Sequence, residues 1–243
     1  MWLYGRNVIR EVLKSGRKIY EIHALKGIKD ADDILNDAAN KGIKVKLSEK
    51  HILAKITGTD KNQGMAANTE GIKDFSIEEF FEKHKNDEMQ TVAVLDEIED
   101  PHNFGAIIRS CEVFGVCGII LARDRSAPLN DVAFKASSGA VEFIDIIRVS
   151  NINLALEQLK EAGFWIYGLD LQAEKFIDET DFDRKTAIVL GNEGRGLRQL
   201  VKKNCDFLVK IRQAGKLDSL NVSNAAAVAF HERLRKTINS KTK

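Results

Sequence analysis

The hydrophobic positions in the first third of the chain switch repeatedly between a helical and a strand-like period. Val8, Ile9, Val12 and Leu13 follow the spacing of one helix face, and the next segment, IYEIHAL, has the composition of a strand. The alternation continues with DADDILNDAANKG as a helix, IKVKLS as a strand, SEKHILAKITG as a helix capped by Ser48, and GMAANTEGI as a strand. This pattern predicts a small α/β domain over residues 1–73.

From residue 91 onward the pattern becomes strand, helix, strand, which is typical of a parallel sheet with crossover helices. The segments expected as strands are TVAVLDE, CGIILA, FIDIIRV, FWIYGLDL, TAIVLG and FLVKIR. The segments expected as helices are FGAIIRSCEVFG, LNDVAFKASSGA, NINLALEQLKEAG and the stretch that follows DSLNVSN. We therefore expect a second, larger α/β domain over residues 91–243, with residues 74–90 as a linker and a helical turn within it as one option.

Charge separates these three parts of the chain, although the net charge of the whole chain is only +1. Residues 1–73 hold 14 Lys and Arg against 9 Asp and Glu, whereas residues 74–90 hold 2 against 6. A phosphate backbone attracts the basic part and repels the acidic part. If the protein binds nucleic acid, we expect the amino-terminal domain to contact it and the linker to avoid it.

Several classes of protein are disfavoured by composition. The chain has no run approaching the ~20 apolar residues of a membrane span, and MWLYGRNVIREVLKSG carries charges where a signal peptide is apolar. Cys111, Cys117 and Cys205 lack the close spacing of a zinc site, and the five histidines are scattered, so we expect reduced thiols and no metal. These observations favour a cytoplasmic protein.

Three polar segments follow predicted strands, where open α/β sheets place their ligands. They are LDEIEDPHNFGAIIRS (95–110), IVLGNEGRGL (188–197) and KIRQAGKLDSLNVSNAA (210–226). The last one crowds small polar residues ahead of a helix: Asp218, Ser219, Asn221, Ser223 and Asn224. One of them is enough to cap the helix, so the alternatives are capping alone or a cradle for a ligand.

The second polar segment does not have the order of a dinucleotide-binding loop. Its glycines, at positions 191, 194 and 196, give G-x-x-G-x-G where the nicotinamide-binding fingerprint is G-x-G-x-x-G. A nucleotide-dependent oxidoreductase is therefore a disfavoured alternative. The three glycines around Glu193 still indicate a tight turn or a close backbone approach to a ligand.

Taken together, the segments DPHNFGAIIRS, IVLGNEGRGL and SLNVSNAAA resemble the three signature motifs of the SpoU branch of the SPOUT RNA methyltransferases. The resemblance implies transfer of a methyl group from S-adenosylmethionine to a ribose 2′-hydroxyl of RNA. The segments RDRSAPLND, SSGAVE and YGRNVIREVL look most like the branch that methylates a guanosine of 23S ribosomal RNA. Relatives that act on transfer RNA share the three motifs, and a catalytically silent RNA-binding relative is a further alternative.

The resemblance also implies the architecture. A knotted, SPOUT-type parallel-sheet catalytic domain would follow an amino-terminal α/β RNA-binding domain that is similar to a ribosomal protein. The enzyme would be a homodimer with its site near the subunit interface. The crowded polar segment would then be part of the knotted chain that holds the cofactor.

By the same resemblance, four residues are expected at the catalytic centre: Asn103, Arg109, Glu193 and Asn221. Asn103 and Arg109 would face the RNA, Glu193 would lie at the centre, and Asn221 would support it. The family's arginine at the position of Arg109 has been proposed as the base, but a guanidinium with a pKa above ~12 is hard to deprotonate. Our hypothesis is that Arg109 clamps the target phosphate and stabilises the developing alkoxide, while a carboxylate or water takes the proton.

Two further groups of residues complete the expected sites. The residues expected around the cofactor are Leu190, Gly191, Gly194, Ile211, Ser219 and Leu220. The candidate RNA contacts are Arg6, Arg10, Lys44, Lys46, Arg123, Arg125 and Lys135. For each of these basic residues, a solvated surface position is the competing interpretation.

Overall fold

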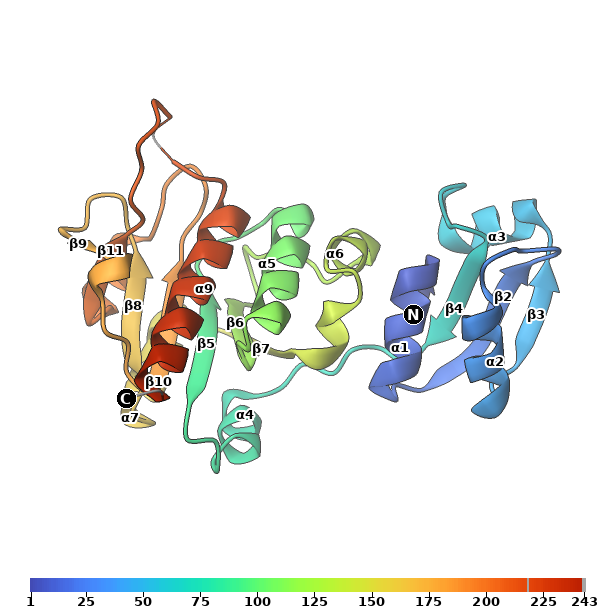
Figure 1. Cartoon of the computed structure of the whole chain (residues 1–243), viewed down its shortest axis with the longest axis horizontal. Helices are drawn as coiled ribbons and strands as arrows, with labels where there is room; N and C mark the ends of the chain where they lie inside the picture. Colours follow the sequence, from blue (N-terminus) through green and yellow to red (C-terminus); the bar gives the residue numbers. More distant parts are fainter. Residues whose placement is uncertain (218, 242–243) are drawn as a thin grey trace.

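The computed structural model describes residues 1–217 and 219–241, which form two α/β domains joined through residues 70–89 (Figure 1). Asp218, the first of the crowded polar residues, lies outside the described part. Each domain has its own sheet, of four and of seven strands. Within the described residues, no helix is both long and apolar enough to cross a membrane.

The amino-terminal sheet has the strand order β1-β4-β2-β3, with β2 and β3 parallel and β4 antiparallel to both β1 and β2. Its strands are β1 (Trp2–Tyr4), β2 (Ile19–Leu25), β3 (Val45–Ser48) and β4 (Met65–Thr69). Its helices are α1 (Arg6–Ser15), α2 (Asp32–Asn40) and α3 (Lys50–Thr57). The predicted helical face of α1 is confirmed, because Val8, Ile9, Val12 and Leu13 are all buried.

Two details of this domain differ from the prediction. The strand β1 was not predicted, because three residues are too few to show an alternating pattern. The expected cap Ser48 is wrong: Glu49 occupies the cap position of α3, and Oγ of Ser48 lies 2.9 Å from Nδ1 of the buried His23. The serine therefore forms a hydrogen bond with a buried histidine of β2 and does not cap the helix.

The acidic segment after this domain is more ordered than a linker. It contains α4 (Ile77–Lys83), which begins with a capping box formed by Ser76 and Glu79. Phe80 of this helix is fully buried and lies against Gly118 at the start of a strand of the larger sheet. This segment thus covers part of the larger sheet, and the acidic side chains of α4, Glu78, Glu79 and Glu82, are exposed.

The larger sheet is entirely parallel and has the order β7-β6-β5-β10-β8-β11-β9. Its strands are β5 (Gln90–Leu95), β6 (Gly118–Ala122), β7 (Asp145–Val149), β8 (Trp165–Leu169), β9 (Lys175–Phe176), β10 (Lys185–Leu190) and β11 (Phe207–Lys210). The remaining helices are α5 (Pro101–Val113), α6 (Asp131–Ala136), η1 (Ala140–Phe143), α7 (Ile152–Glu161), η2 (Ile177–Glu179), α8 (Gln199–Asn204) and α9 (Val222–Lys241). The parallel sheet was predicted, whereas β9, η2 and α8 were not.

Helices cover both faces of this sheet, which explains why its strands are continuous apolar runs. Val92 and Val94 of β5 pack in one cluster with α4, α7 and α8, and Ala93 and Leu95 pack in another with α5 and α9. The second cluster continues into the amino-terminal domain, where Val8 belongs to it. The two domains therefore share a hydrophobic core.

Candidate functional site

Three segments that lie far apart in the chain meet at the carboxyl edge of the larger sheet. The strands β5 and β10 are neighbours, and β8 separates β10 from β11. Because all of these strands are parallel, the segments that follow β5, β10 and β11 leave the sheet at the same edge. These are the three segments that the sequence singled out.

Asn103, Glu193 and Asn221 form one hydrogen-bonded cluster, with one residue from each segment. The side-chain amide of Asn221 donates to Oδ1 of Asn103 at 3.0 Å and to Oε1 of Glu193 at 3.1 Å. The side-chain amide of Asn103 donates to the same Oε1 of Glu193. The structure thus brings together three of the four residues expected at the catalytic centre.

Two helix starts position the asparagines of this cluster. Asp100 caps α5 by accepting from the backbone N–H of Asn103 at 3.2 Å, and Pro101 occupies the first helical position. At α9, Oδ1 of Asn221 accepts from the backbone N–H of Ser223 at 2.9 Å and from its hydroxyl at 2.6 Å. Capping therefore uses the oxygen of Asn221 and leaves its amide N–H groups for the cluster.

A cavity of about 340 Å³ lies beside the cluster, and Glu193 belongs to both. All six residues expected around the cofactor line this cavity: Leu190, Gly191, Gly194, Ile211, Ser219 and Leu220. Its volume is within the range of about 300–1,000 Å³ that is usual for small-molecule sites. The cavity also takes lining residues from the end of β8, including Asp170 and Gln172, which were not predicted.

The loop over residues 191–198 is folded tightly against the end of β5. A Cβ atom on Gly191 would lie 2.3 Å from the carbonyl carbon of Gly196, so only glycine fits there. Arg198 donates from Nε to Oδ1 of Asp96 at 2.7 Å and from its backbone N–H to Oδ2 at 3.0 Å. Because Asp96 is fully buried, this bidentate pair fixes the loop that carries Glu193.

Arg109, the fourth expected catalytic residue, is not part of the cluster within this chain. It lies six residues after Asn103 on α5, roughly 9 Å further along the helix axis and on a different helix face. Its Nη1 donates to Oγ of Ser138 at 3.3 Å, and the arginine is exposed. Within one chain, Arg109 and Glu193 belong to different surfaces.

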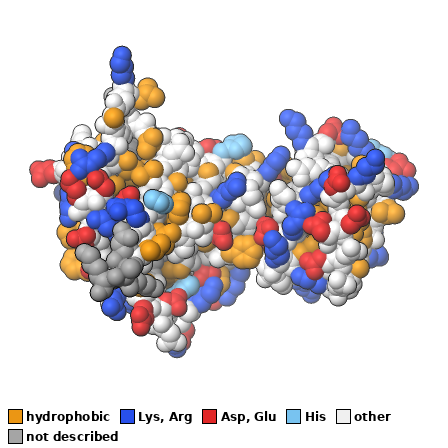
Figure 2. Space-filling model, in the orientation of Figure 1, with side chains coloured by type: hydrophobic (Ala, Val, Ile, Leu, Met, Phe, Trp, Pro, Cys, Tyr) orange, Lys and Arg blue, Asp and Glu red, His pale blue; other side chains and the backbone are white. Residues whose placement is uncertain are grey.

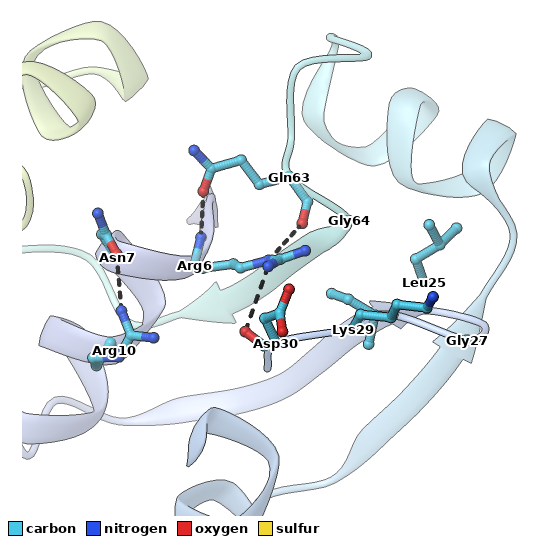
Figure 3. Close-up of a pocket in the computed structure, with 10 residues that line it drawn as sticks. Arg6, Asn7, Arg10, Leu25, Gly27, Lys29, Asp30, Gln63 and Gly64 are labelled. Carbon is cyan, nitrogen blue, oxygen red and sulfur yellow. Dashed lines mark hydrogen bonds between the residues drawn. The ribbon is translucent and has the colours of Figure 1, made fainter. Parts of the chain in front are cut away.

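The basic residues expected to contact RNA in the amino-terminal domain differ in their partners. Arg6 and Arg10 line a cleft of about 680 Å³ (Figure 3). Lys44 is exposed, whereas Nζ of Lys46 lies 2.5 Å from Oε2 of Glu21. Lys46 therefore carries a carboxylate partner that the sequence did not indicate.

The three basic candidates of the larger domain have different surroundings. Arg123 lines a groove together with Glu157 and other residues of α7 and α4. Nη1 of Arg125 lies 2.8 Å from Oε1 of Glu97, and Nζ of Lys135 lies over the Tyr4 ring at 5.8 Å. Figure 2 likewise shows basic and acidic side chains interspersed on the face it draws.

Asp96 and Arg198, like the cavity-lining Asp170 and Gln172, are site residues that the sequence analysis missed. Asp96 directly follows an apolar strand, and this strand-end signal could have identified it. Nothing in the sequence indicates that Arg198 is its partner across about a hundred residues. Among the described residues, no group of three His, Cys, Asp or Glu side chains could hold a metal ion.

Comparison with known families assigns both parts of the chain. The family described as SpoU rRNA Methylase matches residues 90–231, and the family described as RNA 2′-O ribose methyltransferase substrate binding matches residues 2–74. A putative TrmH family tRNA/rRNA methyltransferase of Bacillus subtilis, YacO, is 35% identical over 240 residues. That alignment covers 97% of this chain and 95% of the relative.

Solved structures resemble this fold over one or both domains. The SpoU methyltransferase AviRb from Streptomyces viridochromogenes, solved in complex with AdoMet, superimposes with a TM-score of 0.82 at 22% identity. That match covers 98% of this chain and 90% of AviRb. The TrmH/SpoU tRNA modifying enzyme of A. aeolicus has a TM-score of 0.57 at 27% identity and covers 63% of this chain and 79% of its own.

Proposed function

The chain belongs to the SpoU family of RNA methyltransferases, and we propose that it transfers a methyl group from S-adenosylmethionine to a ribose 2′-hydroxyl of RNA. The observation that carries this proposal is the cluster of Asn103, Glu193 and Asn221 at the rim of the cavity. A donor molecule in the cavity and an RNA strand outside it would meet at Glu193. Glu193 therefore lies between the site of the cofactor and the site of the substrate.

The cavity suits S-adenosylmethionine in its chemistry. Leu190, Ile211 and Leu220 supply apolar walls, while the loop around Gly191 supplies backbone groups. Glu193 provides negative charge for a sulfonium cation, whereas the charge of Asp170 is compensated by Lys202, which lines the same cavity. Bound S-adenosylmethionine supplies an electrophilic methyl group, so the remaining work of the protein is to orient the two reactants and to activate the hydroxyl.

Glu193 is the group that we assign to the ribose hydroxyl. Its Oε1 accepts from both Asn103 and Asn221, and these two bonds hold the carboxylate in a single orientation. Its other oxygen, Oε2, is the acceptor for the hydroxyl proton, directly or through a water molecule. Asn103 and Asn221 act as positioning residues for this carboxylate.

We propose that Arg109 works on the RNA bound at the partner subunit of a homodimer. Arg109 cannot join the cluster of its own chain, because it lies on another face of α5. The packed helices α5 and α9 expose apolar side chains, including Val113 and Val228, that a second copy would cover. In this arrangement Arg109 clamps the target phosphate and stabilises the alkoxide that develops.

The substrate that we propose is a guanosine of 23S ribosomal RNA, with a transfer RNA guanosine as the alternative. The family match over residues 2–74 gives this chain a substrate-binding domain, and the match to the tRNA modifying enzyme spans only 63% of the chain. The segments RDRSAPLND and SSGAVE also favour the branch of the family that methylates ribosomal RNA. We place this activity in the cytoplasm, where Cys111 and the other free thiols stay reduced.

A side-by-side transfer assay tests this proposal. Labelled S-adenosylmethionine is supplied with large-subunit ribosomal RNA or with bulk transfer RNA, and the labelled nucleoside is then identified, with Arg109→Ala as the inactive control. We expect 2′-O-methylguanosine in ribosomal RNA alone. Label in transfer RNA would contradict the ribosomal substrate and favour the transfer RNA alternative. Label in neither RNA would favour a catalytically silent RNA-binding protein.

A further inference from the structure

The amino-terminal domain contains a cleft whose side chains present hydrogen-bond donors. It is formed where the start of α1, the loop after β2 and the loop before β4 meet, and its volume is about 680 Å³ (Figure 3). The three basic side chains in its lining are Arg6, Arg10 and Lys29, and Asp30 is the acidic one. This cleft is separate from the cofactor cavity, which lies in the other domain.

Two backbone carbonyl groups hold the side chain of Arg6 in this cleft. Its Nε donates to the carbonyl oxygen of Gln63 at 3.3 Å, and its Nη1 donates to the carbonyl oxygen of Asp30 at 3.4 Å. Both acceptors are neutral carbonyl groups, so these bonds do not compensate the positive charge of the guanidinium. Several of its N–H donors also remain for a ligand. Figure 3 shows the side chain extended between these two carbonyl groups. A guanidinium held in this way suits the oxygens of a phosphodiester.

Two amides of the cleft are oriented by internal bonds. Oε1 of Gln63 accepts from the backbone N–H of Arg6 at 2.9 Å, and Oδ1 of Asn7 accepts from Nη1 of Arg10 at 2.8 Å. Because the oxygens are engaged inside the protein, the NH₂ groups of Gln63 and Asn7 remain for a ligand. They match acceptors such as phosphate oxygens and the exposed edge of an unpaired base.

The cleft also distinguishes among the basic residues. Nε of Arg10 lies 2.7 Å from Oδ2 of Asp33, so its charge is compensated. Lys29 is exposed and forms no ion pair within the described part of the chain. Lys29, which the sequence analysis did not select, is therefore better placed than Arg10 to contact a phosphate.

The loops around the cleft have backbone conformations that are costly for ordinary residues. Asp30 has φ +55° and Gln63 has φ +54°, and each supplies one of the carbonyl groups that hold Arg6. Such conformations persist where the surrounding structure enforces them, often at ligand sites. Here they aim both carbonyl groups at the same guanidinium.

We propose that this cleft binds one unpaired nucleotide of the substrate RNA, away from the methylated ribose. Arg6 and Lys29 contact its phosphate, the amides of Asn7 and Gln63 contact acceptors on its base, and Leu25 contributes apolar surface beneath it. This inference rests on the proposed RNA substrate. It adds a second anchoring point, so the amino-terminal domain sets which RNA reaches the catalytic centre.

The test compares RNA affinity among single variants of the full-length protein. Arg6→Ala and Lys29→Ala are expected to weaken binding of a large-subunit ribosomal RNA fragment by about tenfold or more. Each is also expected to reduce the slope of log affinity against log salt by about one unit. Lys50→Ala, which removes an exposed lysine of the same domain outside the cleft, is the matched control and should bind as the wild type does.

An isosteric variant tests the donor character of the cleft. Asn7→Asp keeps the oxygen that accepts from Arg10 but replaces the donor NH₂ by a carboxylate oxygen, so it should weaken RNA binding more than Asn7→Ala does. The affinity for S-adenosylmethionine should stay unchanged in all of these variants.

The outcomes separate this proposal from the proposed function. Wild-type RNA affinity in both Lys29→Ala and Arg6→Ala would contradict nucleotide binding in the cleft but would leave the proposed methyltransferase function unaffected. Lys29→Ala decides the matter if Arg6→Ala disturbs the loops, because Lys29 is exposed and forms no hydrogen bond or ion pair among the described residues. A wild-type protein that binds no RNA would overturn the cleft together with the function on which it rests.

Discussion

Arg17 and Glu142 form a buried ion pair that joins the two domains. Nη2 of Arg17 lies 3.0 Å from Oε1 of Glu142, and only 10% and 3% of the two side chains are exposed. Burial lowers the pKa of the Arg17 guanidinium and raises the pKa of the Glu142 carboxyl, while the opposite charge acts against each shift. Each charge is therefore compensated mainly by the other.

Removing one partner should destabilise the protein strongly. Glu142→Ala leaves the Arg17 charge buried without its partner, and we expect a loss of about 3–5 kcal/mol in the free energy of unfolding, measured with urea. Glu82→Ala, which removes one partner of an exposed pair with Lys85, is the control and should cost less than about 1 kcal/mol. Similar costs for the two variants would contradict this role of the ion pair.

The loop that carries Glu193 should tolerate substitution at one glycine and not at another. Gly191→Ala places a methyl group 2.3 Å from the backbone of Gly196, so we expect the loop to shift and the affinity for S-adenosylmethionine to fall at least about tenfold, measured by calorimetry. Gly194→Ala meets only Oδ1 of Asn192, at 3.7 Å, and should leave the thermal unfolding midpoint unchanged. An unchanged affinity in Gly191→Ala would show that the loop is not held as described.

The assignment of Arg109 to the partner subunit predicts complementation. Arg109→Ala and Asn103→Ala should each be inactive alone. We suppose that each active site of a dimer takes Arg109 from one subunit and Asn103 from the other. When the two unfolded variants are mixed and refolded together, about a quarter of the active sites should then be complete. Activity that stays absent in the refolded mixture would place Arg109 and Asn103 in the same subunit's site.

The cysteines should react slowly in the folded protein. Burial raises the pKa of Cys117 and of Cys205 to about 12 and the pKa of Cys111 well above its ordinary value. At pH 8 the thiolate fraction of Cys117 should be about a thousandfold below that of a free thiol. The neutral thiols favour the folded state, and this contribution is complete below about pH 9 and is lost as the pH rises towards 12.

Alkylation with iodoacetamide measures this protection. We expect modification in urea within minutes and modification of the native protein only as the pH is raised. Rapid labelling of the native protein at pH 8 would contradict the burial of these thiols and would reopen the possibility of cysteine chemistry.

The parallel strands were predictable because both faces of the larger sheet are covered, which makes each strand an apolar run such as TVAVL. The fold class, a knotted SPOUT-type domain behind an amino-terminal RNA-binding domain, and the SpoU family are confirmed by the comparisons. S-adenosylmethionine as the cofactor is confirmed at the level of the family. The strand β9 and the helix α8 were missed, because two and six residues are too short for periodicity to show.

Side-chain partners were much harder to predict than strands. Asn103, Glu193 and Asn221 were expected together because each follows a strand in a recognisable motif. Arg10 was a candidate RNA contact with a solvated surface position as the alternative, and its ion pair with Asp33 of a different helix was not predicted. Contacts between distant segments of this kind depend on how the elements pack, and the spacing of charges along the chain does not encode them.

The central claim is that the cluster of Asn103, Glu193 and Asn221 performs the methyl transfer, and a single-turnover measurement on Glu193→Gln tests it most directly. The glutamine keeps an oxygen for the two asparagine amides but is a much weaker proton acceptor. We expect methyl transfer to ribosomal RNA to slow by at least about a hundredfold, with the affinity for S-adenosylmethionine changed less than about threefold. A transfer rate close to that of the wild type would contradict the account, because it would remove Glu193 from the reaction.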